Sequence, residues 1–461
     1  MKLCGFQWLV ASSVLLVALV ASADTRPQYG GTLQVSVREA LTSLDPTDTT
    51  QPDSFARRNL IPLIFETLVT TDDSGHIRPL LATSWRPLNG NQRWQFRMRS
   101  GVKFSDGATL TPGIAAASLR LANSSWKIVS DGDSIIIECD VLCSHLPEEL
   151  ALLCNAIVKK ADDGKLNGTG PFHIADWQSG KKLVLSAEEN YWAGRPFLDA
   201  IEIEFGKGYR EQLVSLEMGK SDLIEISAEQ SHRISTASHR SSTSEPLELL
   251  ALAFTRDAQS PEEKSLREAL ALSIERASIG NVILQGAGKP AASILPDWIS
   301  GYAFAFSTET DLTRARHLRD EVRTASPWTI AYDPADPLAG LLAERIALNA
   351  RDAGLQLQPT KSAVADLRVV RIPLLSDPVM ALAKVAASVG LPPSQIDSNS
   401  AEALYSAERE LLATQKLIPL FHLPVVYAAT PALQDWSPRL DGMWNLADTW
   451  LARNPSGSIN P

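Results

Sequence analysis

The chain has 461 residues, which is too long for a single hydrophobic core and predicts two or three domains. Its hydrophobic content of 44% and charged content of 21% are ordinary for a soluble globular protein. The formal net charge is −10 and the sequence shows no basic patch, which argues against nucleic acid as a partner.

The first residues have the pattern of a secretory signal peptide. Lys2 is the only charged residue before Asp24, residues 6–20 are almost entirely apolar, and Ala21-Ser22-Ala23 is a small-x-small cleavage site. We therefore predict export, with cleavage after Ala23 and a signal peptide at 1–23. The alternative is a retained membrane anchor, since the apolar stretch is only slightly shorter than a spanning helix.

Cleavage leaves three cysteines, Cys139, Cys143 and Cys154. An oxidising compartment permits one disulfide among them and leaves one thiol over. The alternative is three buried thiols. Because no histidine pair lies nearby, the spacing does not suit zinc, and we predict no metal site there.

Beyond the leader, the chain opens with β-structure. Residues 30–37 predict a short strand, which leads through Leu44-Asp45-Pro46 into a polar loop at 47–53. Farther on, residues 112–121 predict a short helix and residues 128–137 a hairpin with an Asp-Gly turn.

The stretch 64–107 predicts a compact β-rich module. Trp94, Phe96 and Met98 alternate with polar residues, which places the large apolar side chains on one face of a strand. Asp73-Ser74-Gly75 and Ser105-Asp106-Gly107 have turn chemistry, because glycine adopts positive φ without steric cost.

A second distinctive block lies at 168–196. It contains Gly168-Thr169-Gly170-Pro171-Phe172, then Trp177, Asn190-Tyr191-Trp192 and Gly194-Arg195-Pro196. The first glycines permit close backbone approach. They do not form a phosphate loop, because no Lys-Ser/Thr follows at the required spacing.

The middle of the chain then mixes strands and helices. Residues 198–205 and 223–226 predict strands, and residues 209–218 a helix that stops at a glycine. The segment 230–244 has no apolar period and predicts an exposed connection. Its histidines, His232 and His239, are interpreted as loop residues rather than metal ligands.

The last part of the chain predicts an α/β lobe between two crossings. Residues 247–255 predict a crossing strand, and Leu417–Tyr427 a strand that returns to the first lobe. Between them, residues 328–357 predict a strand, a helix and a second strand, which make a βαβ unit. Two crossings are what a hinged cleft requires.

Amphipathic helices are predicted on either side of this βαβ unit. The first begins at Ser260, a good N-cap, with Pro261 in the first turn and Glu263 completing a capping box. Its apolar face is Leu266, Leu270, Ile274 and Ala277. Further helices are predicted at 310–323, 337–353 and 401–414.

Catalytic motifs are missing from the sequence. It has no Gly-x-Ser-x-Gly, His-Glu-x-x-His or Walker pattern, so we predict that the protein is not an enzyme and carries no cofactor. Trp298, Tyr302 and Tyr332 are predicted to line a cleft, because each falls in or beside a loop between elements. His422 is a further cleft candidate, with a core or cleft histidine without metal favoured over a metal ligand.

The blocks at 64–107 and 168–196 closely resemble the family 5 extracellular solute-binding proteins, the dipeptide, oligopeptide and nickel receptors of bacterial ABC importers. Arg267-Glu268-Ala269-Leu270 resembles a recurrent helix of that family. The stretch 286–298 resembles the loop that borders the family's cleft.

The resemblance implies a type II periplasmic binding protein fold of the α/β class, with two lobes, a hinged cleft and an inserted small β-rich domain. Lobe I is then expected at 24–68, 166–250 and 420–461, the small domain at 69–165, and lobe II at 251–419.

The resemblance also implies a function. The protein is expected to be a periplasmic monomer that captures peptides or similar small polar solutes and delivers them to an ABC permease of the inner membrane. By their offset from Leu44-Asp45-Pro46, the residues Gln51, Pro52 and Asp53 are expected to contact the ligand.

The chain departs from the family between Gly354 and Thr414. In peptide receptors this region carries an Asp that holds the amino terminus of the peptide, whereas here the segment is short and only Ser376-Asp377-Pro378 is similar to it. The ammonium-binding Asp is therefore not carried over. The alternative function is an exported sensor or interaction protein that keeps the fold without transport.

Overall fold

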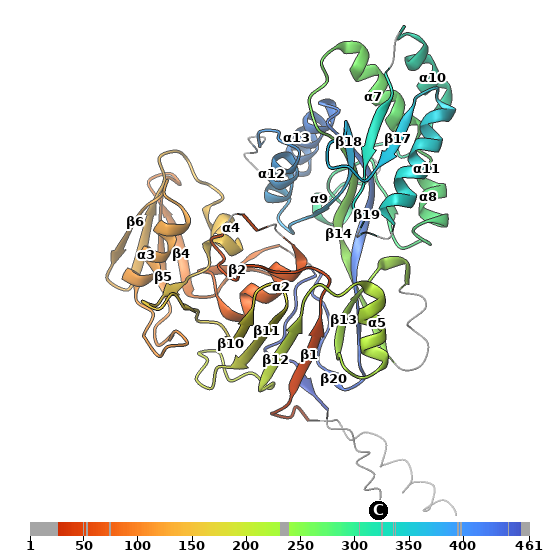
Figure 1. Cartoon of the computed structure of the whole chain (residues 1–461). Helices are drawn as coiled ribbons and strands as arrows, with labels where there is room; N and C mark the ends of the chain where they lie inside the picture. The colour runs from red at the N-terminus through yellow and green to blue at the C-terminus, as the bar shows by residue number, and fades with distance from the viewer. Residues whose placement is uncertain are drawn as a thin grey trace, which may run out of the picture.

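One long mixed sheet runs through both lobes of the molecule (Figure 1). The computed structural model describes residues 26–452 except 49, 52–53, 73–74, 231–238, 304, 324–325, 335, 337, 394–395, 397–398 and 441. Over these residues eleven strands form the sheet, and β15 (Lys289–Pro290) pairs with β19 beside the main path. Across the sheet the order is β10 (Phe172–Gln178), β11 (Lys182–Ala187), β12 (Ala200–Glu204), β1 (Thr32–Ser36), β13 (Leu223–Ile226), β19 (Leu417–Ala429), β14 (Arg240–Phe254), β18 (Leu367–Pro373), β16 (Trp328–Ala331) and β17 (Leu357–Thr360).

The first lobe contains the β10–β13 side of the sheet. Strand β1 runs parallel to β12 and β13, while β11 and β10 continue the sheet antiparallel. Alternate residues of β11 and β12, such as Leu183 and Ile201, are fully buried in one core with Leu33. Helix α2 (Phe55–Ile64) supplies apolar residues to the same core, and α5 (Tyr209–Glu217) packs beside β13.

The small β-rich domain projects from the first lobe at the left of Figure 1. Its four-stranded sheet has Trp94 and Phe96 buried on one face, as their alternation predicted. The domain contains β2 (Val69–Thr71), β3 (Ile77–Pro79), β4 (Ala82–Leu88), β5 (Arg93–Met98), α3 (Pro112–Ala122), β6 (Lys127–Asp131), β7 (Ser134–Glu138), α4 (Leu146–Leu150) and the 3₁₀ turn η1 (Leu153–Asn155). Two short strands, β8 (Lys159–Lys160) and β9 (Leu166–Asn167), follow it.

The second lobe places helices on both faces of β14, β18, β16 and β17. One face is covered by α7 (Pro261–Ser273), α8 (Arg276–Val282), α10 (Leu312–Asp320) and α11 (Ala339–Asp352). The other is covered by α9 (Asp297–Ser300), α12 (Pro378–Ser388) and α13 (Ala401–Ala413). Each face has its own buried core, and β16, α11 and β17 form the predicted parallel βαβ unit. The C-terminal part returns to the first lobe with β20 (Leu433–Gln434) and β21 (Trp450–Leu451).

The two lobes are joined through β14 and β19, which cross between them side by side. Pro246 of β14 lies opposite Pro424 of β19, and the register shifts on both sides of Pro246. Proline has no backbone N–H, so the strand ladder loses hydrogen bonds at the crossing. Ser244 Oγ compensates in part by accepting from Val425 N at 3.0 Å. Because fewer hydrogen bonds hold the two strands together at this crossing, we infer that the hinge lies here.

The structure differs from the sequence-based expectations at several elements. Residues 240–244 are not a loop but the start of β14, held by pairing with 426–429. The helix that begins at Ser260 ends at Ser273, and Ala277 belongs to α8. The reason is Arg276, whose guanidinium donates to the carbonyls of Ala291 and Pro419 and fixes a new helix start.

The cysteines, the signal peptide and the domain limits were also predicted from the sequence. Of the three cysteines, Cys139 and Cys143 form the disulfide, and Cys154 lies outside it. The predicted signal peptide and His232 lie outside the described residues. The domain limits given above stay a prediction.

Candidate functional site

Helix α2 positions the residues at the base of a cleft between the lobes. Its N-cap is Ser54, whose side chain accepts from Arg57 N at 3.2 Å. Most of the helix is buried, including the charged Arg57 and Arg58, which are both 6% exposed. Because the cost of burying a charge is high, both guanidinium groups need nearby acceptors.

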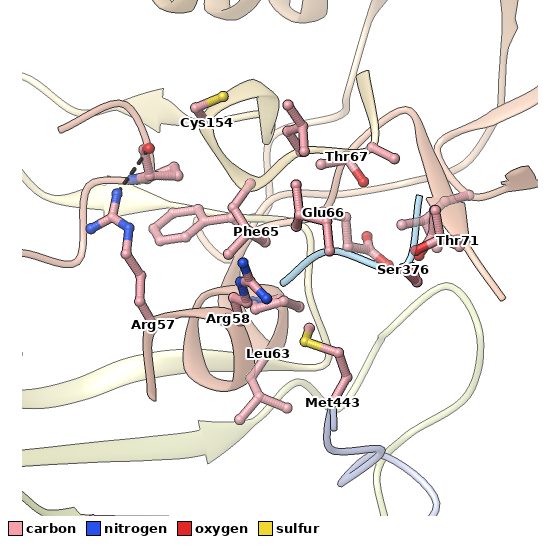
Figure 2. A pocket seen from close by; sticks show the side chains of 18 of the residues that line it. Arg57, Arg58, Leu63, Phe65, Glu66, Thr67, Thr71, Cys154, Ser376 and Met443 are labelled. Carbon is pink, nitrogen blue, oxygen red and sulfur yellow. Dashed lines mark hydrogen bonds between the residues drawn. The ribbon is translucent and has the colours of Figure 1, made fainter. Parts of the chain in front are cut away.

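The cleft has a volume of about 690 Å³, which is within the usual range for small-molecule pockets. In Figure 2 the side chains of α2 and the following residues share this space with Cys154, with Ser376 of the second lobe and with Met443. The cleft is lined by some residues of each of the segments 46–51, 57–71, 148–154, 374–384 and 439–447. Leu80, Pro171 and Tyr191 complete the lining. The cleft therefore lies where both lobes and the small domain meet.

Arg57 lies at the end of the cleft that is formed by the loop after β1. Its Nη2 donates to the carbonyls of Asp45 and Pro46, each at 2.9 Å, and more distantly to that of Asp48. Its Nη1 is buried and has no hydrogen-bond partner among the described residues. Arg57 thus fixes the polar loop through Nη2, while its Nη1 remains without an acceptor among the described residues.

Arg58 connects the two lobes directly. Its Nη1 donates to the carbonyl of Leu374 and its Nη2 to that of Pro373 at 3.2 Å, both at the end of β18. A guanidinium from the first lobe thus contacts the second lobe beside the cleft.

Glu66 is a buried carboxylate that also lines the cleft. It accepts from Tyr191 Oη at 2.7 Å, Thr169 Oγ1 at 2.8 Å and Trp192 Nε1 at 2.9 Å. Burial raises the pKa of Glu66, although these hydrogen bonds oppose the shift. The carboxylate therefore holds the second sequence block against the end of α2.

Two glycines allow that block to approach α2. A Cβ on Gly168 would lie 1.8 Å from the carbonyl oxygen of Ile64, and one on Gly170 would lie 2.6 Å from that of Leu63. Gly170 N donates to Ile64 O at 2.9 Å. The close approach that the glycines predicted is what brings Thr169 to Glu66.

The second-lobe wall of the cleft is the start of α12. Asp377 is its N-cap, and its carboxylate accepts from Met380 N at 2.8 Å. Met380 and Lys384, one and two turns into the helix, also line the cleft. Burial raises the pKa of Glu148, which faces this wall from α4, and the charge of Asp377 adds to the shift while that of His145 opposes it.

Of the predicted ligand contacts in the first loop, only Gln51 can be placed. It lines the cleft and accepts from Thr42 Oγ1 at 2.9 Å. Pro52 and Asp53 lie outside the described residues.

The other predicted contacts do not line this cleft. Trp298 Nε1 donates to Pro246 O at 2.9 Å, beside the hinge. Tyr302 donates to Glu408 and packs on the α12–α13 core, and Tyr332 packs on the opposite core against Gly340. His422 is 4% exposed, with Nε2 3.0 Å from Ile294 O, and burial lowers its pKa to about 4. The ligand-binding role of these residues stays a prediction.

The described part of the chain holds no group of three or more His, Cys, Asp or Glu that suits a metal ion.

The sequence analysis did not identify Arg57, Arg58 and Glu66 as cleft residues. Two adjacent arginines in an apolar stretch are nevertheless a usable signal, because buried charges need specific partners. In the same described part no helix has the length and apolar character needed to cross a membrane.

A family model and several relatives of known name are similar to this chain in sequence. The family model described as "Bacterial extracellular solute-binding proteins, family 5 Middle" matches residues 146–368. The nickel-binding protein NikA of Staphylococcus aureus is 25% identical over 362 residues, covering 74% of this chain and 72% of the relative. The oligopeptide-binding protein AppA of Bacillus subtilis is 23% identical over 298 residues, covering 58% of this chain and 54% of the relative.

Solved structures share the fold. The crystal structure of a dipeptide binding protein from Pseudoalteromonas sp. SM9913, in complex with Met-Leu, superimposes with a TM-score of 0.80 at 16% identity. The superposition covers 91% of this chain and 100% of the Pseudoalteromonas chain. The predicted fold class, two hinged lobes with an inserted small β-rich domain, is confirmed.

Proposed function

We propose that the chain is a member of the bacterial extracellular solute-binding proteins of family 5 and the substrate-binding protein of an ABC importer. It captures peptides or similar small polar solutes between its lobes and delivers them to a permease in the inner membrane. The observation that carries this proposal is the cleft of about 690 Å³, which both lobes and the small domain line with charged and apolar side chains.

The architecture supports capture by closure. Two antiparallel strands join the lobes, and their ladder is interrupted where Pro246 faces Pro424. Arg58 of the first lobe reaches carbonyl groups of the second. A ligand that contacts both walls binds the closed form better than the open one, and this difference in affinity drives closure.

The relatives indicate the class of cargo. AppA is named for oligopeptides, NikA for nickel, and the Pseudoalteromonas protein was solved with Met-Leu. We favour peptides or other small polar solutes for this chain, since its cleft combines several charges with a large apolar lining. A chelated metal is the second class of cargo, and the chain itself does no chemistry on either.

The finer features of the proposal follow from the sequence. We propose that the leader at 1–23 directs export and is removed after Ala23, so that a soluble monomer reaches the periplasm. The permease then recognises the closed form.

Native mass spectrometry of the protein purified from a periplasmic extract tests this function. We expect a monomer of residues 24–461 carrying one small polar molecule, which is released on denaturation unchanged. A protein that retains no small molecule and binds none of a panel of peptides, polar solutes and nickel chelates would contradict the proposal. Conversion of the released molecule during incubation would replace it with an enzymatic function.

A further inference from the structure

A cavity within the second lobe is separate from the interlobe cleft. Its volume is about 380 Å³, which is enough for a small organic molecule. The walls come from α7, the loop before α10, the end of α13 and the start of β19, and no lining residue is shared with the cleft. Much of the lining is apolar, and it includes Ala271, Leu272, Leu412 and Ile418.

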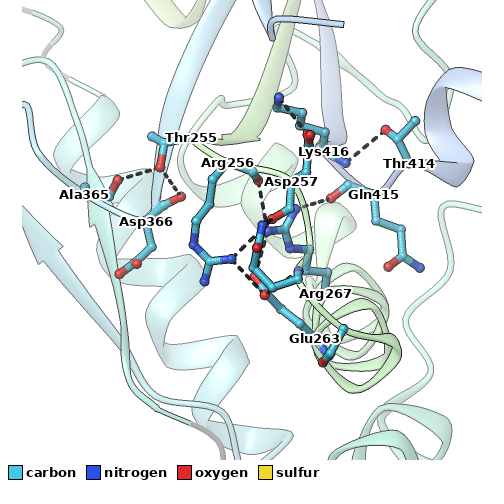
Figure 3. A network of polar contacts seen from close by, with 12 residues as sticks. Thr255, Arg256, Asp257, Glu263, Arg267, Ala365, Asp366, Thr414, Gln415 and Lys416 are labelled. Carbon is cyan, nitrogen blue, oxygen red and sulfur yellow. Dashed lines mark hydrogen bonds and ion pairs between the residues drawn. The ribbon is translucent and has the colours of Figure 1, made fainter.

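Two buried arginines also line this cavity, Arg267 with 1% of its surface exposed and Arg276 with 4%. Arg267 has a counter-charge, because its Nη2 donates to Glu263 at 2.7 Å (Figure 3). Burial lowers the pKa of Arg276 to about 10, and no acidic side chain among the described residues opposes that shift. Since a buried charge without a counter-charge is costly, Arg276 favours an anion in the cavity.

The two acidic residues of the lining do not supply that counter-charge. Glu268 forms an ion pair with Arg314 at 2.6 Å. Glu309 is exposed, and water and salt weaken the field of an exposed charge. Neither of them changes the pKa of Arg276.

The guanidinium of Arg276 keeps hydrogen-bond donors at its end. Nε and Nη2 both donate to Pro419 O, at 3.3 and 2.8 Å, and Nε also donates to Ala291 O at 3.0 Å. Nη1 has only a long contact of 3.4 Å with Ala271 O. Because each terminal nitrogen carries two hydrogens, Nη1 and Nη2 each retain an N–H. Two such parallel donors match the two oxygens of a carboxylate.

Two further polar atoms of the lining residues are buried without a hydrogen-bond partner in the described part of the chain. They are Nε of Arg267 and Oε1 of Gln415. The two residues are neighbours, since Arg267 Nη1 donates to Gln415 O at 3.3 Å (Figure 3). A half-turn of the Gln415 amide exchanges its oxygen for the NH₂ group, which donates. Both side chains can therefore add donors to those of Arg276.

We propose that this cavity binds a small organic acid as its carboxylate, with the two oxygens held by the end of the Arg276 guanidinium. Arg267 and Gln415 lie beside the carboxylate, and the apolar body of the acid packs against Leu272 and Ile418. The site is additional to the interlobe cleft and does not depend on the proposed function. Because the acid binds the folded lobe, it stabilises the protein.

Benzoate, benzamide and benzylamine are the probes, because they have similar shapes and carry a negative charge, no charge and a positive charge. Thermal unfolding and calorimetry of the purified protein measure their binding. We expect benzoate at about 10 mM to raise the unfolding midpoint by about 2 °C or more. Benzamide should bind at least about tenfold more weakly, and benzylamine should not bind.

Acetate, phenylacetate and inorganic phosphate complete the panel. Phenylacetate should stabilise the protein more than acetate does, because it adds apolar surface. If no carboxylate raises the midpoint, or if benzamide is as effective as benzoate, the proposal is overturned. A preference for phosphate over every carboxylate overturns it as well.

The variant Ala271→Phe locates the site, because its ring extends from α7 into the cavity and leaves Arg276 in place. We expect benzoate to bind this variant at least about tenfold more weakly. Ala277→Phe is the matched control, since Ala277 is exposed on the next helix and does not line the cavity. Benzoate binding to Ala271→Phe at wild-type strength would place the acid elsewhere and overturn the proposal.

Arg276→Lys tests the role of the guanidinium fork, because lysine keeps the charge and loses the paired donors. We expect the folded variant to bind benzoate at least about tenfold more weakly, and unchanged binding overturns the assignment to Arg276. Since Arg276 also fixes the start of α8, urea unfolding is measured first. If this variant does not fold, Ala271→Phe decides the question.

Discussion

At the scale of single residues, the cleft depends on charges that are buried and specifically bonded. Arg57, Arg58 and Glu66 follow each other closely in the chain, yet they have different partners: the polar loop, the second lobe and the block at 168–196. Each partner is distant in sequence or belongs to another element. The chemistry of the site is therefore set by which acceptors the fold brings to the two arginines and which donors it brings to Glu66.

Arg58 carries the first prediction. Replacing it with Ala removes hydrogen bonds from a charged donor to Leu374 O and Pro373 O, each worth about 1.5–3 kcal/mol. Because these bonds join the lobes, we expect a larger open population and an apparent affinity at least about tenfold weaker. Small-angle scattering with and without ligand, together with calorimetry, checks this outcome. A variant that closes and binds as the wild type does would show that Arg58 only stabilises the first lobe.

At the scale of elements, the block at 168–196 depends on glycines for its position against α2. We predict that Gly168→Ala destabilises the protein by about 3 kcal/mol or more, since its Cβ would lie 1.8 Å from a backbone oxygen. Gly113→Ala in α3 is the control, because its Cβ meets only Thr111 Oγ1 at 3.8 Å. That substitution is expected to be neutral or slightly stabilising. Urea unfolding of both variants measures the difference, and equal stabilities would contradict the close approach.

The start of α7 contains a polar network that ties the helix to the loop before β19 (Figure 3). Glu263 accepts from Arg256 Nη1 at 2.8 Å and from Arg267 Nη2 at 2.7 Å, and Arg267 also donates to Gln415 O. Burial alone would raise the pKa of Glu263, but its hydrogen bonds from Arg256, the backbone and Arg267 outweigh burial and lower the pKa to about 2.

This lowered pKa predicts a pH-dependent contribution to stability. A carboxylate whose pKa is lower in the folded state stabilises the protein above its unfolded pKa, near 4.5, and the contribution is lost as the pH falls toward 2. Glu263→Gln should therefore cost about 2 kcal/mol at pH 7, and the difference from wild type should shrink as the pH is lowered. Chemical unfolding from pH 7 to pH 3 measures it, with exposed Glu217→Gln as control. A difference that does not change with pH would mean that Glu263 acts only through its shape.

At the scale of the whole molecule, closure should change the accessibility of the cleft. Cys154 is exposed, lines the cleft and lies outside the Cys139–Cys143 disulfide. We expect alkylation of its thiol to slow at least about tenfold when ligand closes the lobes, because the opposite wall then excludes the reagent. Mass spectrometry of the labelled protein measures the rate, and Cys154→Ser identifies the reacting site. An unchanged rate at saturating ligand would show that binding does not close this part of the cleft.

Much of the architecture followed from local patterns in the sequence. The alternation of Trp94, Phe96 and Met98 predicted β5 and its buried face, and the capping residues at Ser260 predicted the start of α7. The strand–helix–strand pattern at 328–357 predicted the βαβ unit. Such signals are local, because side-chain period and backbone capping depend on residues a few positions apart.

Other elements were overlooked because their stability is not local. Helix α2 contains Pro62 near its end and two buried arginines, a combination that does not favour a helix in isolation. Residues 240–244 have no apolar period, and they form a strand because residues 426–429 provide a ladder for them. Tertiary contacts override propensity in both cases.

The sequence by itself determined the two-lobe fold with its β-rich insertion, because that information lies in local periods and in blocks that resemble a known family. Apart from Gln51, which the sequence predicted, the tertiary structure decided which of the described residues form the cleft. In the folded chain α2, α4 and the start of α12 surround one space. Trp298 lies beside the hinge, Tyr302 and Tyr332 pack on the two cores of the second lobe, and His422 is buried. The physical reason is that a binding site needs acceptors and donors from distant segments, and their meeting depends on packing that no local pattern records.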